Sequence, residues 1–272
     1  MRKVVIAFNG SHFSEGAFEF ARRMNVERTI LLTGIFLPQT DYAGLWSYAG
    51  PLGGTLYDRL LEEEHSEDLE KNIAHFECLC NKHQIAYSIH KNFSDFALPG
   101  LIKETRFSDL AIISCETLYS NMGNEHYEYV KELLHTAECP VIMVPEQFTY
   151  PTGNILAYDG SESAAYAIKQ FTYLFPEWHS HKTLLVYTQE TMQEIPDEFY
   201  IKELTARHFT ALTSMVLPIQ ESKYFSTWIS EQPASILVSG AFSKSYFARM
   251  FKKSFVADVL KEHLLPVFMA HR

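Results

Sequence analysis

A short apolar run that stops at Asn or Asp followed by Gly and Ser occurs twice in this chain. The first copy is Arg2-Lys-Val-Val-Ile-Ala-Phe-Asn9-Gly10-Ser11, and the second is Asn154-Ile-Leu-Ala-Tyr-Asp159-Gly160-Ser161. Each run passes into a stretch with helical spacing, which is typical of a buried strand that ends at the N-terminus of a helix. Gly160 lies 150 positions after Gly10, so the chain reads as one unit written twice.

A second pair of matches shares a different offset. Asp109-Leu-Ala-Ile-Ile-Ser resembles Ser235-Ile-Leu-Val-Ser, and Glu138-Cys-Pro-Val-Ile-Met-Val resembles Leu264-Leu-Pro-Val-Phe-Met-Ala, both 126 positions apart. The halves therefore align with one deletion of 24 residues in the second. A repeat of domain size indicates tandem domains and not a solenoid. We expect domains at 1–148 and 152–272, called here the first half and the second half, with a linker at 146–153.

Strands alternate with helices along both halves, which indicates an α/β layer fold with open parallel sheets. In the first half the pattern predicts strands at 4–8, 29–36, 85–90, 109–114 and 141–144, and helices at 14–23, 60–83, 98–105 and 127–135. In the second half it predicts strands at 155–158, 182–188, 215–220, 236–238 and 267–270, and helices at 163–175, 198–213, 224–230 and 254–263.

Composition excludes several classes of protein. No apolar run reaches the roughly 18 residues of a membrane helix, and residues 4–8 are too short for a signal peptide. The four cysteines have no framework spacing, which favours a reducing, cytoplasmic compartment. A net charge of −10 argues against a nucleic-acid partner, because phosphate backbones require basic faces.

The second-half segment that follows its fourth strand, 239–255, is a candidate phosphate-binding loop. It opens with Gly240 and reaches a serine, Ser254, at a predicted helix N-terminus, and it carries four basic residues within an acidic chain. Backbone N–H groups and the positive end of a helix can hold a phosphate there. The alternative is that Ser254 is only a helix cap and that the lysines are solvated.

These residues also carry a family resemblance that covers both halves. Through the strand that ends in Asp159-Gly160-Ser161 and the final helix that runs into a Pro-apolar strand, the chain resembles the universal stress protein family in its tandem two-domain form. ATP-binding members have a G-x2-G-x9-G-(S/T) loop, and the matching frame here is Gly240-x2-Ser243-x9-Lys253-Ser254. Ser243 and Lys253 thus replace two glycines, and each restricts the backbone.

The resemblance implies an adenine nucleotide alpha hydrolase-like fold with Rossmann-like layers. It also implies that 141–144 and 267–270 pair within the chain as a pseudo-dimer. ATP or another adenine nucleotide, with Mg only alongside it, would bind in the second half. The residues implied are Asp159, Val186, Tyr187, Gly240, Ser243, Lys253, Ser254 and Phe255. The first half would not bind ATP in this way, because Asn9 replaces the aspartate and Tyr127-Glu128 stands where Gly-Ser would be.

Three functions follow from this reading. The leading one is a stress-response sensor or regulatory module without catalysis; the alternatives are a slow ATP hydrolase and an interaction scaffold with both sites degenerate.

We expect no catalytic set. We also expect no metal site, because Cys78 and Cys80 do not share a helix face, and we expect these two cysteines to be buried. His179 and His181 are expected to be solvated. The Gly- and aromatic-rich segment 38–58 reads as a long loop, either functional or packed on the body. Association of two chains into a homodimer stays open.

Overall fold

The structure is a computed structural model of the whole chain. It describes residues 1–9, 12–37, 57–91, 97–115, 133–189, 194–218, 228–229, 231–232, 234–240 and 265–270. Structural statements below concern these residues. Of the predicted loop 38–58, residues 38–56 lie outside them, and residues 57–58 belong to a helix instead. The predicted helix 254–263 also lies outside them, and of the predicted helix 127–135 only 133–135 is described, as part of a helical turn at 133–136.

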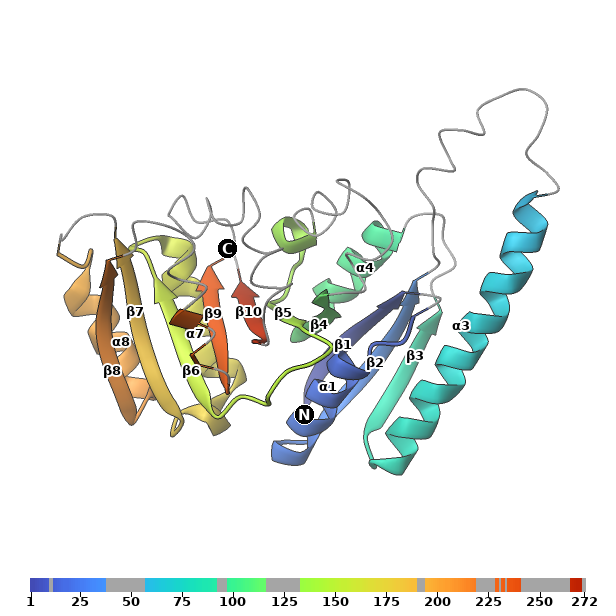
Figure 1. Cartoon of the computed structure of the whole chain (residues 1–272), viewed down its shortest axis with the longest axis horizontal. Coiled ribbons are helices and arrows are strands. Elements are labelled where there is room, and N and C mark those ends of the chain that lie inside the picture. Colours follow the sequence, from blue (N-terminus) through green and yellow to red (C-terminus); the bar gives the residue numbers. More distant parts are fainter. Residues whose placement is uncertain are drawn as a thin grey trace, which may run out of the picture.

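The centre of the fold is one sheet of ten strands in the order β3-β2-β1-β4-β5-β10-β9-β6-β7-β8. First-half strands occupy one side of this sheet and second-half strands the other (Figure 1). The strands are β1 (Arg2–Asn9), β2 (Ile30–Leu37), β3 (Ala86–Lys91), β4 (Leu110–Ser114), β5 (Val141–Val144), β6 (Gly153–Tyr158), β7 (Lys182–Gln189), β8 (Ala211–Pro218), β9 (Ser235–Gly240) and β10 (Val267–Ala270).

All strand pairs are parallel except the central one, where β5 and β10 run antiparallel with Ile142 opposite Phe268. The predicted α/β class and the predicted pairing of 141–144 with 267–270 are therefore confirmed. Reading outward from this pair, each half has its strands in equivalent chain order: fifth, fourth, first, second and third.

Helices cover both faces of the sheet. They are α1 (Glu15–Glu27), α3 (Tyr57–Lys82), α4 (Ala97–Arg106), α7 (Glu162–Leu174) and α8 (Glu198–His208), with a short 3-10 turn, η1, at Pro176–Trp178. Buried residues of α1, α3, α7 and α8 join one apolar cluster, whereas Leu101 of α4 and Ile229 join a second cluster on the opposite face. The result is a three-layer α/β/α fold.

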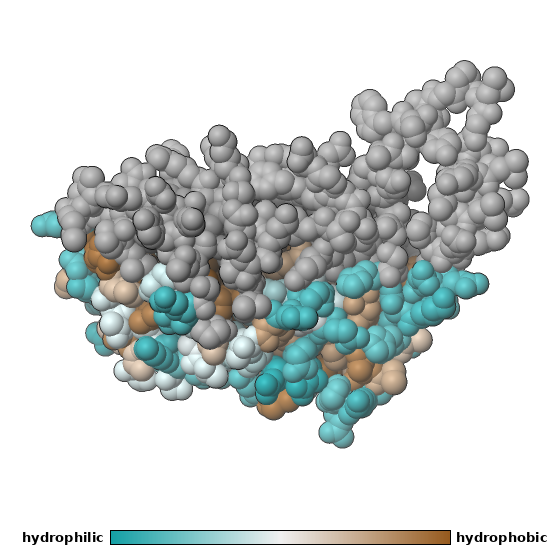
Figure 2. Space-filling model, in the orientation of Figure 1, coloured by the Kyte–Doolittle hydropathy of each residue, from teal (hydrophilic) through white to brown (hydrophobic). Residues whose placement is uncertain are grey.

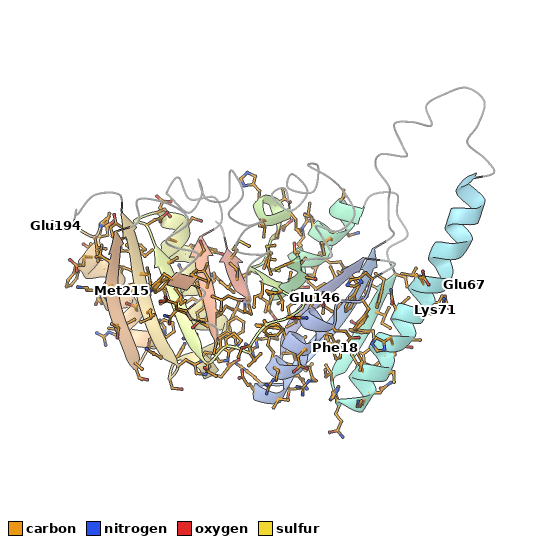
Figure 3. The ribbon with its side chains drawn as sticks, viewed as in Figure 1. Phe18, Glu67, Lys71, Glu146, Glu194 and Met215 are labelled. Atoms are coloured by element: carbon orange, nitrogen blue, oxygen red, sulfur yellow. The ribbon has the colours of Figure 1, made fainter. Side chains whose placement is uncertain are left out.

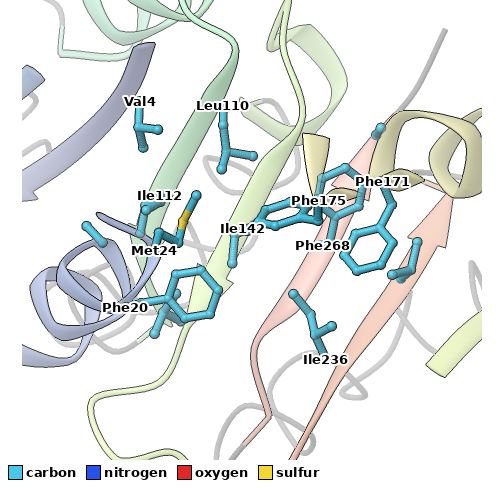
Figure 4. Packing of buried hydrophobic residues seen from close by; sticks show 14 of the residues in the cluster. Val4, Phe20, Met24, Leu110, Ile112, Ile142, Phe171, Phe175, Ile236 and Phe268 are labelled. Atoms are coloured by element: carbon cyan, nitrogen blue, oxygen red, sulfur yellow. The ribbon is translucent and has the colours of Figure 1, made fainter. Parts of the chain in front are cut away.

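The first cluster runs without a break across the β5–β10 junction. Val4, Ile112 and Ile142 of the first half continue into Phe268 and Phe171 of the second half, all fully buried (Figure 4). The two halves therefore share one continuous core on this side of the sheet.

On the outer surface, the face in Figure 2 shows hydrophilic residues interspersed with smaller hydrophobic areas over its described part.

Polar contacts also hold the two halves together near the amino ends of β1 and β6. The Arg2 guanidinium donates to the Glu177 carboxylate at 2.5 Å and lies 5.4 Å over the Phe175 ring. From α1, the Glu27 carboxylate accepts the indole N–H of buried Trp178 at 2.7 Å. These contacts join residues more than 150 positions apart in the sequence.

One predicted boundary was wrong. The helix expected over 198–213 ends at His208, and the strand expected at 215–220 begins at Ala211. Phe209 closes the helix with extended backbone angles while its N–H still bonds to Thr205. The strand starts early because β7 offers a partner for all eight residues of β8, from Lys182 opposite Ala211 onward.

Candidate functional site

The candidate site lies at the carboxyl ends of the second-half strands. β6 pairs with β7 on one side and with β9 on the other, so the strand order reverses at β6. Ligands of open parallel α/β sheets bind in the crevice at such a reversal. Asp159 follows β6 directly, and Gly240 is the last residue of β9. The two predicted residues therefore end neighbouring strands.

A tight turn positions Asp159. Its Oδ1 accepts the backbone N–H of Ser161 at 2.9 Å, and Ser161 Oγ in turn accepts the N–H of Ala164 as the N-cap of α7. Between them, Gly160 has φ +83, and a Cβ there would lie 2.8 Å from Pro196. Only glycine meets both demands, because L side chains rarely adopt that φ. The Asp-Gly-Ser sequence therefore presents a half-buried carboxylate at the start of α7.

Tyr158 makes further contacts beside this turn. Its hydroxyl donates to the carbonyl of Pro196 at 3.1 Å, and its ring lies 6.4 Å from that of Tyr187. Burial raises the pKa of the Tyr158 phenol, and the nearby carboxylates of Asp197 and Asp159 raise it further. The phenol therefore stays protonated and serves as a structural donor at neutral pH.

The two predicted adenine-pocket residues point to opposite faces of the sheet. Val186 is fully buried in the cluster that contains Ala157, and Tyr187, 7% exposed, lies in the cluster that contains Tyr158. Neighbouring residues of a strand alternate in this way. A ligand in contact with Val186 would therefore lie on one face of the sheet, and a ligand in contact with Tyr187 would lie on the other.

Gly240 has a packing role that sequence reasoning missed. A Cβ at this position would lie 2.5 Å from the backbone nitrogen of Ala164 and 2.5 Å from the carbonyl carbon of Ser163. The end of β9 thus lies directly against the first turn of α7. Glycine is required here for close strand–helix packing, whatever else this residue does.

The remaining predicted site residues, Ser243, Lys253, Ser254 and Phe255, lie outside the described residues. So do Tyr127 and Glu128 of the first half, whereas Asn9 is the last residue of β1. The structure thus brings Asp159, Gly240 and the strand carrying Val186 and Tyr187 to neighbouring positions at one sheet edge. Within the described ranges, no three His, Cys, Asp or Glu side chains are grouped so that they could hold a metal ion.

The first half holds a second feature that sequence reasoning missed, at Glu146. This residue was assigned to the linker, but its carboxylate accepts the backbone N–H of Gly16 at 3.0 Å and the Ser114 hydroxyl at 2.8 Å. The only local signal for it is a carboxylate two residues after a buried strand. Glu146 therefore contacts the ends of two other elements in the first half.

Two side-chain predictions need correction. Cys80 is buried as expected, and burial raises the pKa of its thiol to about 12, but Cys78 is exposed. His181 is not solvated as expected: its ring stacks 5.7 Å from that of Trp178, and burial lowers its pKa. His179 contacts the carbonyl of Thr172 through Nε2 at 2.9 Å. Its ring also lies 5.7 Å from that of Phe209, so each histidine packs against an aromatic residue of the body.

Comparison with solved structures identifies the fold. A universal stress protein from Archaeoglobus fulgidus is similar over 100% of this chain and 96% of its own, with a TM-score of 0.71 and 13% sequence identity. The chain has the universal stress protein fold. A putative universal stress protein and a protein of unknown function, both from Pseudomonas aeruginosa, are similar over 100% of this chain and 93% and 92% of theirs, each with a TM-score of 0.51 and 12% identity.

At the level of sequence, no protein-family model and no curated protein matches the chain. The similarity is therefore one of fold. Among the described helices, none combines the length and the apolar character that crossing a membrane requires.

Proposed function

We propose that this chain is a cytoplasmic universal stress-type protein that acts as a stress-response sensor or regulatory module. In this proposal, residues 1–148 and 152–272 are two domains of one origin, and only the second binds ATP or another adenine nucleotide, with Mg accompanying the nucleotide. The observation that supports it most is the position of Asp159 at the strand-order reversal, beside the N-terminus of α7.

Each proposed ligand contact has a physical reason. Asp159 offers a carboxylate to the hydroxyl or amino donors of the adenosine side, and Val186 or Tyr187 lines the base. Gly240, Ser243, Lys253, Ser254 and Phe255 form the phosphate side, where Lys253 supplies charge in place of a family glycine. A carboxylate and a lysine without a positioned base suit binding better than efficient phosphoryl transfer. The proposal therefore favours a binding module over an enzyme.

Calorimetry with ATP and magnesium tests this proposal. The informative variant is Lys253→Ala, and its neighbour Lys252→Ala is a matched control with the same change of charge. If Lys253 contacts the phosphate directly, Lys253→Ala should bind ATP about tenfold more weakly, which corresponds to a loss of about 1.4 kcal/mol in binding free energy. Lys252→Ala should bind as the wild type does. Equal effects of both variants would indicate general charge attraction, and no binding by the wild type would refute the nucleotide proposal.

Asp159→Asn tests the other end of the ligand. The amide keeps an oxygen at the position that accepts the Ser161 N–H, so the turn should survive. Loss of ATP affinity without loss of stability would support a ligand role for the carboxylate. Release of inorganic phosphate that depends on a divalent ion would instead favour the hydrolase.

An interaction scaffold is the second candidate, and one observation favours it. Phe199 and Tyr200 at the start of α8 are 73% and 69% exposed, and their rings lie 5.5 Å apart. Exposed aromatic pairs are common at protein interfaces. A second copy of this chain seated there would produce a homodimer, which analytical ultracentrifugation of the wild type and of a Phe199→Ser/Tyr200→Ser variant would detect.

A further inference from the structure

Glu146 places a carboxylate at the N-terminus of α1. Its Oε2 accepts the backbone N–H of Gly16, 130 residues earlier in the chain, and its Oε1 accepts the Ser114 hydroxyl at the end of β4. His12 Nε2 lies 3.9 Å from the same Oε1. Figure 3 shows Glu146 near the middle of the molecule, on the first-half side. Two segments of the first half, residues 12–16 at the start of α1 and the end of β4, therefore converge on one carboxylate.

This position is one where an anion is stabilised. The first N–H groups of a helix have no partner within the helix, and the helix dipole favours negative charge there. In α1, Ser14 Oγ accepts the N–H of Ala17 at 3.1 Å, and Glu146 accepts that of Gly16. The side chain thus supplies the hydrogen-bond acceptor and the negative charge that a bound phosphate would otherwise supply.

The main chain around Glu146 also fills the space. A Cβ on Gly16 would lie 2.4 Å from the carbonyl oxygen of Pro145 and 2.6 Å from the Cα of Glu146. Backbone therefore lies in direct contact with the first turn of α1. Backbone thus fills the space on the Cβ side of Gly16, whereas the Glu146 side chain occupies the position in front of the Gly16 N–H.

The second half differs at the corresponding sequence positions. With the offset of 126 residues that aligns β5 with β10, Ser114 corresponds to Gly240 and Glu146 to Arg272. The hydroxyl donor is replaced by glycine, and the carboxylate is replaced by a cation. The two halves therefore carry opposite charges at this position in the sequence.

We propose that Glu146 is an internal anion that closes the N-terminus of α1 to phosphate-bearing ligands. It determines that the first half excludes such ligands, and its removal opens an anion-binding position at Gly16. This role concerns the first half alone, so it holds whether or not the second half binds a nucleotide.

The sequence allows the backbone amide of Gly16 to be labelled selectively. Of the 12 glycines, only Gly16 follows a glutamate. Labelling glutamate with 13C at its carbonyl and glycine with 15N therefore yields a single cross-peak in an HNCO spectrum, that of the Gly16 amide. This amide is the donor to Glu146, so its chemical shift reports what accepts its hydrogen bond.

The experiment titrates inorganic phosphate into the full chain, against chloride at equal ionic strength. The variant is Glu146→Ala, and the matched control is Glu67→Ala, which removes a carboxylate that is 80% exposed on α3, far from Glu146 (Figure 3). In the wild type and in Glu67→Ala, the Gly16 peak should not move with phosphate. In Glu146→Ala, it should start from a different position and move saturably with phosphate.

Two outcomes would overturn the proposal: a wild-type Gly16 peak that moves with phosphate as much as the variant's, or a folded Glu146→Ala whose peak responds to phosphate no more than to chloride. If Glu146→Ala does not fold, Glu146→Gln decides, because the amide keeps an acceptor for Gly16 and removes the charge. Its Gly16 peak should respond to phosphate more than that of the wild type, and an equal response refutes the proposal. Phosphate bound only in the second half leaves this peak in place, which separates the inference from the proposed function.

Discussion

Replacing Gly240 with alanine should destabilise the protein by a steric effect that can be worked out from the structure. The new Cβ would lie 2.5 Å from two backbone atoms of the first turn of α7, a separation that real Cβ atoms essentially never show. This turn cannot yield easily, because Ser161 caps it and Ala164 is only 2% exposed. Forcing extra atoms into such a contact costs about 1–3 kcal/mol.

An opposing effect has to be weighed against this cost. Alanine restricts the unfolded chain more than glycine does, which stabilises a protein by about 0.4–1 kcal/mol where the native backbone tolerates it. The steric cost is the larger of the two. We therefore expect Gly240→Ala to lower the free energy of unfolding by about 1.3 kcal/mol, the difference between the midpoints of these two ranges (about 2 and about 0.7 kcal/mol), measured by urea titration with an unchanged slope.

Gly153→Ala is the matched control at the other end of the same half. Its Cβ would meet the Ser235 hydroxyl at 3.0 Å, which can rotate away, and the Lys182 carbonyl oxygen at 3.3 Å, a contact that a shift of a few tenths of an ångström relieves. It should change stability by less than about 1 kcal/mol. If Gly240→Ala is as stable as Gly153→Ala, the packing argument is wrong. If Gly240→Ala is stable but no longer binds ATP, the role of Gly240 is in phosphate binding and not in packing.

Three further predictions follow from single contacts. Glu27→Ala removes the acceptor of the buried Trp178 indole and should lower the free energy of unfolding by about 1–3 kcal/mol in urea titrations. Ser161→Ala removes the side-chain cap of α7 and should cost about 1 kcal/mol in the same assay. Burial lowers the pKa of His181, although the Glu27 carboxylate opposes this, so the unfolded state takes up more protons below about pH 6.5. The contribution of neutral His181 to stability should be fully present above that pH and should be lost as the pH is lowered through the folded-state pKa. The melting temperature of His181→Phe should therefore depend less on pH than that of the wild type.

Most strands were predictable because their signals are local, whereas the pairing of β5 with β10 was implied by the family resemblance and not by the residues. β5 and β10 have the predicted bounds, since each is a short apolar run directly after a proline turn. The end of α8 was not predictable in the same way. Its boundary depends on β7, which offers hydrogen-bond partners along all of β8, and this is a tertiary effect.

The candidate site was predictable only in part, for the same reason. Asp159-Gly160-Ser161 is a local motif, and its turn forms as expected. The partners of Gly240 and Glu146 belong to helices far away in the sequence, and no periodicity encodes them. His181 looked like a surface residue because only the fold shows that Trp178 packs beside it.

The asymmetry between the halves does not come from the helix caps themselves. Ser14 and Ser161 adopt similar φ values of −84 and −83, and each accepts the N–H three residues on, so local sequence treats α1 and α7 alike. The difference comes from what contacts each first turn. α1 meets a carboxylate at Glu146, whereas α7 meets a residue without a side chain at Gly240. The proposed exclusion of phosphate from the first half therefore depends on the tertiary contact between Glu146 and the first turn of α1, and not on the local sequence of this helix.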